Sequence, residues 1–175
     1  MSEERAPVPI PDSVRAELVR MGDADRSERE DMSVERLQDT AFLRALARSD
    51  SVRSLRLREI VHRWGWPDTV RAGPEAADAA FLVIQHSPME GFREAVLPML
   101  EAAASAGRMP ASDVALLVDR VLVHRGEPQR YGTQFALEDG RLVAQPVEDP
   151  ARLDERRRAM ELPPMDTYMR ALAET

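Results

Sequence analysis

The chain has 175 residues, of which 43% are hydrophobic, and it carries a formal net charge of −7 at pH 7. This length and composition suit one domain with a sizeable core, and no apolar run reaches the ~20 residues of a membrane span. The chain has no cysteine and all 24 of its basic residues are arginine, which excludes thiol nucleophiles, cysteine metal sites, Schiff-base lysines and a P-loop lysine.

The acidic charge balance also bears on partners and location. Nucleic-acid binding needs a basic face that replaces counterions, so we expect no nucleic-acid partner. Residues 1–11 are acidic and then rich in proline, without the basic and apolar stretches of a secretory signal. We therefore expect a flexible N-terminal segment over residues 1–11, a cytoplasmic protein and no membrane partner.

Residues 12–175 are predicted to form a single domain that is mainly α, a compact multi-helix bundle-like fold with one β-hairpin in its C-terminal half. The first helix is expected after Pro11, with Val14, Leu18 and Met21 on its apolar face. Residues 23–31 are too charged for a core. That stretch is expected to be either a solvated continuation of the helix or a mobile segment.

Two helices are predicted next along the chain. The first begins near Ser33 and ends at Asp50 and Ser51, where the apolar pattern is interrupted. The second ends at Trp64-Gly65-Trp66-Pro67, because glycine and proline both oppose the continuation of a helix.

The most apolar helix is predicted from Gly73-Pro74-Glu75 to Gln85-His86. Proline at the first helical position and glutamate in the first turn are typical of a helix start. The many small residues of this helix predict a close approach of its neighbours, so we expect it to be central. Further helices are expected over about 89–106, with a kink at Pro98, and from Pro110 to about His124.

The pattern then changes to a loose alternation over about 131–147. Asp139-Gly140 lies within it and is a strong signal for a two-residue hairpin turn. An isolated hairpin is marginally stable, so we expect this one to pack on helices. Two C-terminal helices are expected to start at Asp149-Pro150 and Pro163-Pro164. The arginine run at 152–158 is interleaved with acidic residues, which predicts a solvated helix face with internal ion pairs.

Several short strings of this chain resemble a bacterial family known only as a domain of unknown function. The main matches are Trp64-Gly65-Trp66-Pro67, Gln85-His86 and Pro128-Gln129-Arg130-Tyr131-Gly132-Thr133-Gln134-Phe135, with supporting matches at Asp119-Arg120-Val121-Leu122, Pro146-Val147-Glu148-Asp149-Pro150 and Leu162-Pro163-Pro164. The resemblance covers about Arg56 to the C-terminus. It implies a predominantly helical domain and no known activity. The chain departs from the family pattern at Ser87-Pro88, where Ala-Asp is expected, and at His124, where asparagine is expected.

Of the three histidines, His86 is the strongest candidate for chemistry. It follows a wholly apolar helix, which carries Gln85 and His86 toward the interior or the rim of a cleft. Beside a carboxylate, an imidazole becomes a general base near neutral pH. The alternative is a structural histidine that closes a helix terminus. No two histidines have the i, i+4 spacing of metal ligands, so no metal site is predicted.

Residues 129–134 concentrate hydrogen-bonding groups just before the predicted hairpin. Arg130 could clamp a carboxylate or phosphate, Tyr131 could donate to a developing oxyanion or relay a proton, and Gly132 would let the backbone approach a ligand. The alternative is a structural latch, in which Arg130 pairs with an acid such as Asp119 or Asp25.

Two functions from different classes remain open. The first is a small-molecule enzyme that uses acid–base chemistry, without a cofactor, on a polar or anionic substrate in a pocket around His86, Arg130, Tyr131 and Gln134. The catalytic candidates are His86, Arg130 and Tyr131, and the candidate substrate-binding residues are Gln85, Gln134, Trp66, Asp25 and Asp119. The second is a helical interaction or regulatory module in which the same cluster is a latch. In either case we expect a monomer or a homodimer.

Overall fold

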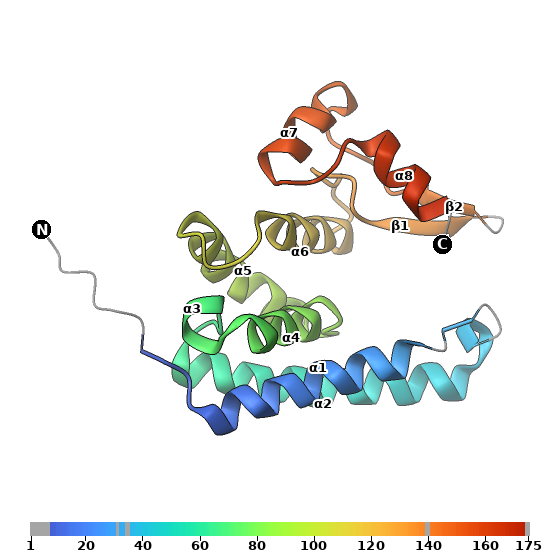
Figure 1. Cartoon of the computed structure of the whole chain (residues 1–175). Coiled ribbons are helices and arrows are strands. Elements are labelled where there is room, and N and C mark those ends of the chain that lie inside the picture. The colour runs from blue at the N-terminus through green and yellow to red at the C-terminus, as the bar shows by residue number, and fades with distance from the viewer. Residues whose placement is uncertain (1–7, 31, 34–35, 139–140, 174–175) are drawn as a thin grey trace, which may run out of the picture. The chain divides into compact units, whose positions relative to one another are not determined.

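The structure is a computed structural model that describes residues 8–30, 32–33, 36–138 and 141–173. The chain separates into two compact units, residues 1–99 and 100–175. Within the described ranges it forms eight α-helices, two short 3₁₀ turns and one two-stranded antiparallel sheet (Figure 1). The prediction of a mainly α fold with one hairpin in the C-terminal half is therefore confirmed, while the single domain over 12–175 stays a prediction.

The first unit contains α1 (Asp12–Glu30), a 3₁₀ turn (Arg36–Gln38), α2 (Thr40–Trp64), α3 (Thr69–Ala72), α4 (Pro74–Gln85) and the first part of α5 (Glu90–Ser105). The second unit contains the end of α5, α6 (Ala111–His124), β1 (Phe135–Glu138), β2 (Arg141–Ala144), a 3₁₀ turn (Pro150–Arg152), α7 (Leu153–Ala159) and α8 (Met165–Ala173).

Helix α1 runs through the charged stretch as far as Glu30, so this part of the chain continues the helix. Its charged residues are not all solvated, however, because Asp25 is fully buried. A buried carboxylate needs partners that carry the opposite charge or donate hydrogen bonds. Asp25 finds them on two other helices, as described below.

Helix α2 is a single helix where two were predicted, and it starts at Thr40 rather than near Ser33. The side chain of Asp39 caps it by accepting the amides of Ala41 and Phe42, which satisfies donors that have no partner within the helix. Asp50 lies within the helix because its carboxylate accepts hydrogen bonds from arginine side chains and does not compete for the helix backbone. The predicted end at Trp64 is confirmed, and Gly65 follows with φ 74°.

Helix α4 packs against α1, α2 and α3 within the first unit (Figure 1). It starts at Pro74 and ends at Gln85, as the sequence predicts. The predicted close approach is also present: a Cβ on Gly22 of α1 would lie 2.6 Å from the Cβ of Ala79 on α4. This contact leaves no room for a side chain at residue 22.

In the second unit, β1 and β2 pair antiparallel, with Phe135 opposite Ala144 and Glu138 opposite Arg141. The predicted Asp139-Gly140 turn lies outside the described residues. The ring of Phe135 lies 5.9 Å from that of Tyr168 on α8, so the hairpin packs on a helix as expected. The predicted C-terminal helices correspond to α7 and α8.

Residues 1–7 of the predicted flexible N-terminal segment lie outside the described residues. The part that follows them is held in place: Ile10 is buried, and its amide donates to the carbonyl of Arg71 at 2.9 Å. Of the helices within the described ranges, none combines the length and the apolar character that crossing a bilayer requires.

Candidate functional site

The first unit joins His86 to a buried carboxylate. Nδ1 of His86, at the C-terminus of α4, lies 2.7 Å from Oδ2 of Asp25 on α1. Asp25 is fully buried, whereas the His86 side chain is 26% exposed. In such a pair, a carboxylate that accepts the Nδ1 proton selects the neutral tautomer whose other ring nitrogen, Nε2, carries no proton. The Nε2 lone pair of a neutral His86 is then left without a role in this pair.

Asp25 is held by two arginines that the sequence analysis did not single out. Its Oδ1 accepts a hydrogen bond from Arg29 at 2.8 Å and lies 3.5 Å from Nη2 of Arg53. Arg29 and Arg53 also bind Asp50 at 2.8 and 2.9 Å. These contacts fix the carboxylate that orients His86, as a rigid supporting shell must do.

Arg53 extends this network to Glu28, whose carboxylate it binds at 2.7 Å. The hydrogen bond from Arg53 lowers the pKa of Glu28 below its ordinary value of 4.5. The sequence could have indicated part of this network. Asp25 and Arg29 are four residues apart and Asp50 and Arg53 are three apart, and oppositely charged residues at these spacings on a helix form ion pairs. The packing of α1 on α2 joins the two pairs. No local sequence pattern predicts this packing.

In the second unit, Asp119 of α6 organises the loop before the hairpin. The Asp119 carboxylate is fully buried and accepts the amides of Arg130, Tyr131 and Thr133 at 2.7 to 3.2 Å. It also accepts the hydroxyl of Thr133 at 2.9 Å. Asp119 therefore binds the backbone of this loop and not the Arg130 guanidinium, which differs from the predicted latch.

Gln129 and Arg157 hold the same loop from other sides. The buried Gln129 side chain donates to the carbonyls of Gln134 and Gln145 and accepts the Gln134 amide at 2.8 Å. Arg157, also fully buried, donates to the carbonyls of Tyr131 and Pro163. The arginine run of α7 is thus not wholly solvated, since its buried member Arg157 binds loop carbonyls and forms no ion pair with any of the described residues.

With its backbone held in this way, the loop presents Arg130 outward. The Arg130 side chain is 55% exposed, and its Nε lies 3.7 Å from the equally exposed carboxylate of Glu148, an ion pair of small energetic value. Tyr131 is half-buried, and this burial raises the pKa of its phenol above the ordinary value. Tyr131 is therefore a proton donor at neutral pH. Gln134 is also half-buried, and its amide donates to the Thr133 hydroxyl at 3.1 Å.

The remaining predicted site residues, Gln85 and Trp66, are both buried in the first unit. Trp66 therefore lies in the core of that unit. Of the acidic candidates, Asp25 orients His86 and Asp119 orients a loop. Nowhere in the described ranges do three or more histidine and acidic side chains lie together so that they could hold a metal ion.

Comparisons with known proteins place the chain in a family. No curated protein and no solved structure matches it. The sequence model of one protein family, described as a family of unknown function (DUF6624), matches residues 11–175. This match includes both the Asp25–His86 pair and the loop that Asp119 organises. The chain belongs to this family of unknown function, DUF6624.

Proposed function

We propose that this protein is an enzyme that acts on a small polar or anionic molecule and uses His86 as its general base or acid. The observation that supports this proposal is the 2.7 Å contact between the partly exposed His86 and the fully buried Asp25. A carboxylate that accepts the Nδ1 proton fixes the tautomer of the ring and stabilises the imidazolium that forms when Nε2 takes up a proton. Arg29 and Arg53 hold that carboxylate in place.

For the second unit, we propose that Arg130 and Tyr131 are ligand-binding groups. The support is that Asp119, Gln129 and Arg157 form hydrogen bonds with the backbone of the loop and so hold it in place. That arrangement leaves the Arg130 guanidinium more than half exposed. A guanidinium on a rigid loop can bind a carboxylate or phosphate with two parallel hydrogen bonds.

The test of the catalytic proposal is a substrate search that compares wild type with His86→Gln. Both proteins are incubated with pools of small carboxylic acids and phosphorylated metabolites, and consumption is followed by mass spectrometry. We expect wild type to consume a compound at a rate that His86→Gln lowers by about 10²-fold or more, the usual contribution of a general base. His124→Gln, which removes an exposed histidine at the C-terminus of α6 outside both sites, is the control and should retain the activity.

Equal consumption by wild type and His86→Gln would contradict the proposal. So would the absence of any consumption together with a loss of ~2–4 kcal/mol in the unfolding free energy of His86→Gln, since that cost is typical of a buried structural pair. In that case His86 closes the end of α4 as a structural residue.

The second candidate function is an interaction or regulatory module. The contacts of Asp119, Thr133 and Gln129 favour it, because they hold a loop in place through hydrogen bonds within the protein. In that function the loop is a scaffold and partners bind elsewhere on the surface. Arg130→Ala then leaves every small-molecule interaction unchanged, whereas the first proposal expects it to weaken anion binding.

A further inference from the structure

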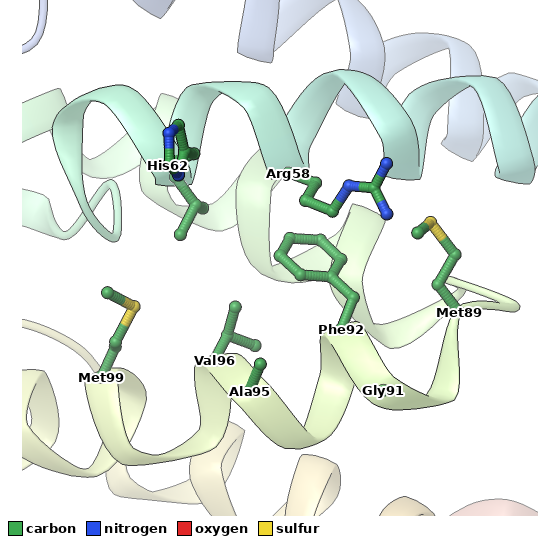
Figure 2. A pocket seen from close by; sticks show the side chains of 9 residues that line it. Arg58, His62, Met89, Gly91, Phe92, Ala95, Val96 and Met99 are labelled. Carbon is green, nitrogen blue, oxygen red and sulfur yellow. The ribbon is translucent and has the colours of Figure 1, made fainter.

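The first unit has a groove between α2 and α5 that is separate from the Asp25–His86 pair. Its volume is about 580 Å³, which lies within the usual range of small-molecule sites. Figure 2 shows the two helices that form its walls. The groove is lined by Arg58, Val61, His62, Met89, Gly91, Phe92, Ala95, Val96 and Met99.

The α5 wall of this groove is apolar. Met89, Phe92, Val96 and Met99 follow one another at intervals of three and four residues, so they line one side of the helix and the turn before it (Figure 2). Phe92 and Val96 are buried, while Met99 is 42% exposed. Unbranched methionine side chains adapt to the shape of a ligand, which makes such a wall suitable for an apolar body of variable form.

The α2 wall carries two basic side chains. Arg58 and His62 are four residues apart on α2, and in Figure 2 the Arg58 side chain extends toward Phe92 and Met89. Neither has an ion pair or side-chain hydrogen bond with any of the described residues. The nearby Arg56 differs, because its guanidinium binds the carboxylates of Glu17 and Glu59. The Arg58 guanidinium opposite the apolar α5 wall is complementary to a molecule with one anionic group and an apolar body.

We propose that this groove binds a small amphipathic carboxylic acid. Arg58 binds the carboxylate, since a guanidinium and a carboxylate can form two parallel hydrogen bonds. The apolar body lies against Phe92, Val96 and Met99, where its burial supplies most of the affinity. His62 lies at the same wall and adds a second donor. The site does not include His86 or Asp25, so it stands independently of the proposed catalysis.

The test compares octanoate with octanol by isothermal titration calorimetry on the full chain. The two probes have the same carbon chain and differ in the charged group. We expect octanoate to bind wild type more tightly than octanol, and Arg58→Met to weaken octanoate about tenfold or more, the value of a charge-assisted hydrogen bond. Arg48→Met is the matched control, because Arg48 is an exposed arginine of the same helix outside the groove. It should leave the octanoate affinity unchanged.

A second variant checks the position of the site. Ala95 is exposed and lines the groove, so Ala95→Trp should fill the groove, abolish binding of both probes and leave the thermal midpoint near that of wild type. The proposal is overturned if octanoate does not bind, if both probes bind wild type equally, or if Arg58→Met or Ala95→Trp leaves octanoate binding unchanged. A dimer in sedimentation that Ala95→Trp dissociates, without octanoate binding, would assign the groove to a second copy of the chain.

Discussion

At the scale of single residues, Asp119 shows how one carboxylate determines the conformation of a loop distant in sequence. It accepts the amides of Arg130, Tyr131 and Thr133 together with the Thr133 hydroxyl. No apolar side chain could replace it, because those donors would lose their acceptor in a place from which water is excluded. The conformation of the loop around Arg130 thus depends on a residue that precedes it by more than ten positions.

Replacement of Asp119 should therefore cost much stability. We expect Asp119→Ala to lower the free energy of unfolding by about 3–5 kcal/mol, since several donors lose their acceptor. Asp119→Asn should cost less, because one oxygen still accepts hydrogen bonds. Urea unfolding followed by circular dichroism measures both values. Glu127→Gln, a change at an exposed residue in the turn after α6, is the control. If Asp119→Ala lowers the free energy of unfolding by no more than Glu127→Gln does, the loop does not depend on Asp119.

Tyr131 gives a second prediction at this scale, which concerns pH. Burial raises the pKa of Tyr131 above its ordinary value of 10.0, with smaller effects from nearby charges. The folded chain thus favours the neutral phenol. Its contribution to stability is complete below pH 10.0 and is lost as the pH rises through the higher pKa of the folded state. An alkaline titration followed by ultraviolet absorbance measures that pKa.

Because the chain has two tyrosines, the titration is done on Tyr168→Phe, in which Tyr131 alone gives the signal. We expect its midpoint to lie above that of the same variant in concentrated urea. A midpoint at or below the unfolded value would contradict this prediction and would mean that the phenol is solvated or stabilised as a phenolate.

At the scale of elements, the packing of α4 on α1 depends on small residues. Gly22 and Ala79 approach so closely that a Cβ at residue 22 would lie 2.6 Å from the Ala79 Cβ and 3.0 Å from its Cα. The two helices would have to move apart to admit even one methyl group. Asp25 lies one turn after Gly22 on α1, and so this contact also positions the partner of His86.

We therefore expect Gly22→Ala to destabilise the protein although alanine is the better helix former. Overpacking costs about 1–3 kcal/mol, which exceeds the gain of up to ~1 kcal/mol in helix propensity. Gly91→Ala on α5 is the matched control, because a Cβ there meets nothing within 4 Å. It should leave stability unchanged or raise it slightly. Thermal unfolding of the two variants decides the point, and equal midpoints would argue against a tight contact between α1 and α4.

The predicted helix boundaries were correct where the determining residues act locally and wrong where they depend on a distant partner. The ends of α2 and α4 follow from glycine and proline, whose backbone constraints act locally. The false break at Asp50 arose because a charged residue within a helix resembles a terminus when its partners are unknown. Arg29 and Arg53, which bind that carboxylate, come from another helix and from the next turn.

At the scale of the whole molecule, the charge of the chain bears on its partners. The net charge of −7 is the sum of 24 arginines and 31 acidic residues. Many arginines are already engaged within the fold, as Arg29, Arg53 and Arg157 are. A nucleic acid would have to displace those internal partners or meet a surface of its own sign.

We accordingly expect no binding to duplex DNA or to single-stranded RNA. Fluorescence anisotropy of labelled oligonucleotides at low salt is the measurement, because low salt favours any electrostatic association. A thermal melt of the same sample shows that the chain is folded. Binding that weakens steeply as salt is added would contradict this expectation and would point to a basic surface.

The sequence by itself determined the mainly α class, the position of the hairpin, most helix boundaries and the absence of cysteine and lysine chemistry. These properties depend on periodicity, turn residues and composition, which act over a few residues. Only the tertiary structure decided that His86 meets Asp25, 61 residues away, and that Asp119 binds the backbone amide of Arg130 and not its guanidinium. Such pairs form because helices pack in one particular way, and packing sums many weak contacts that no short stretch of sequence contains.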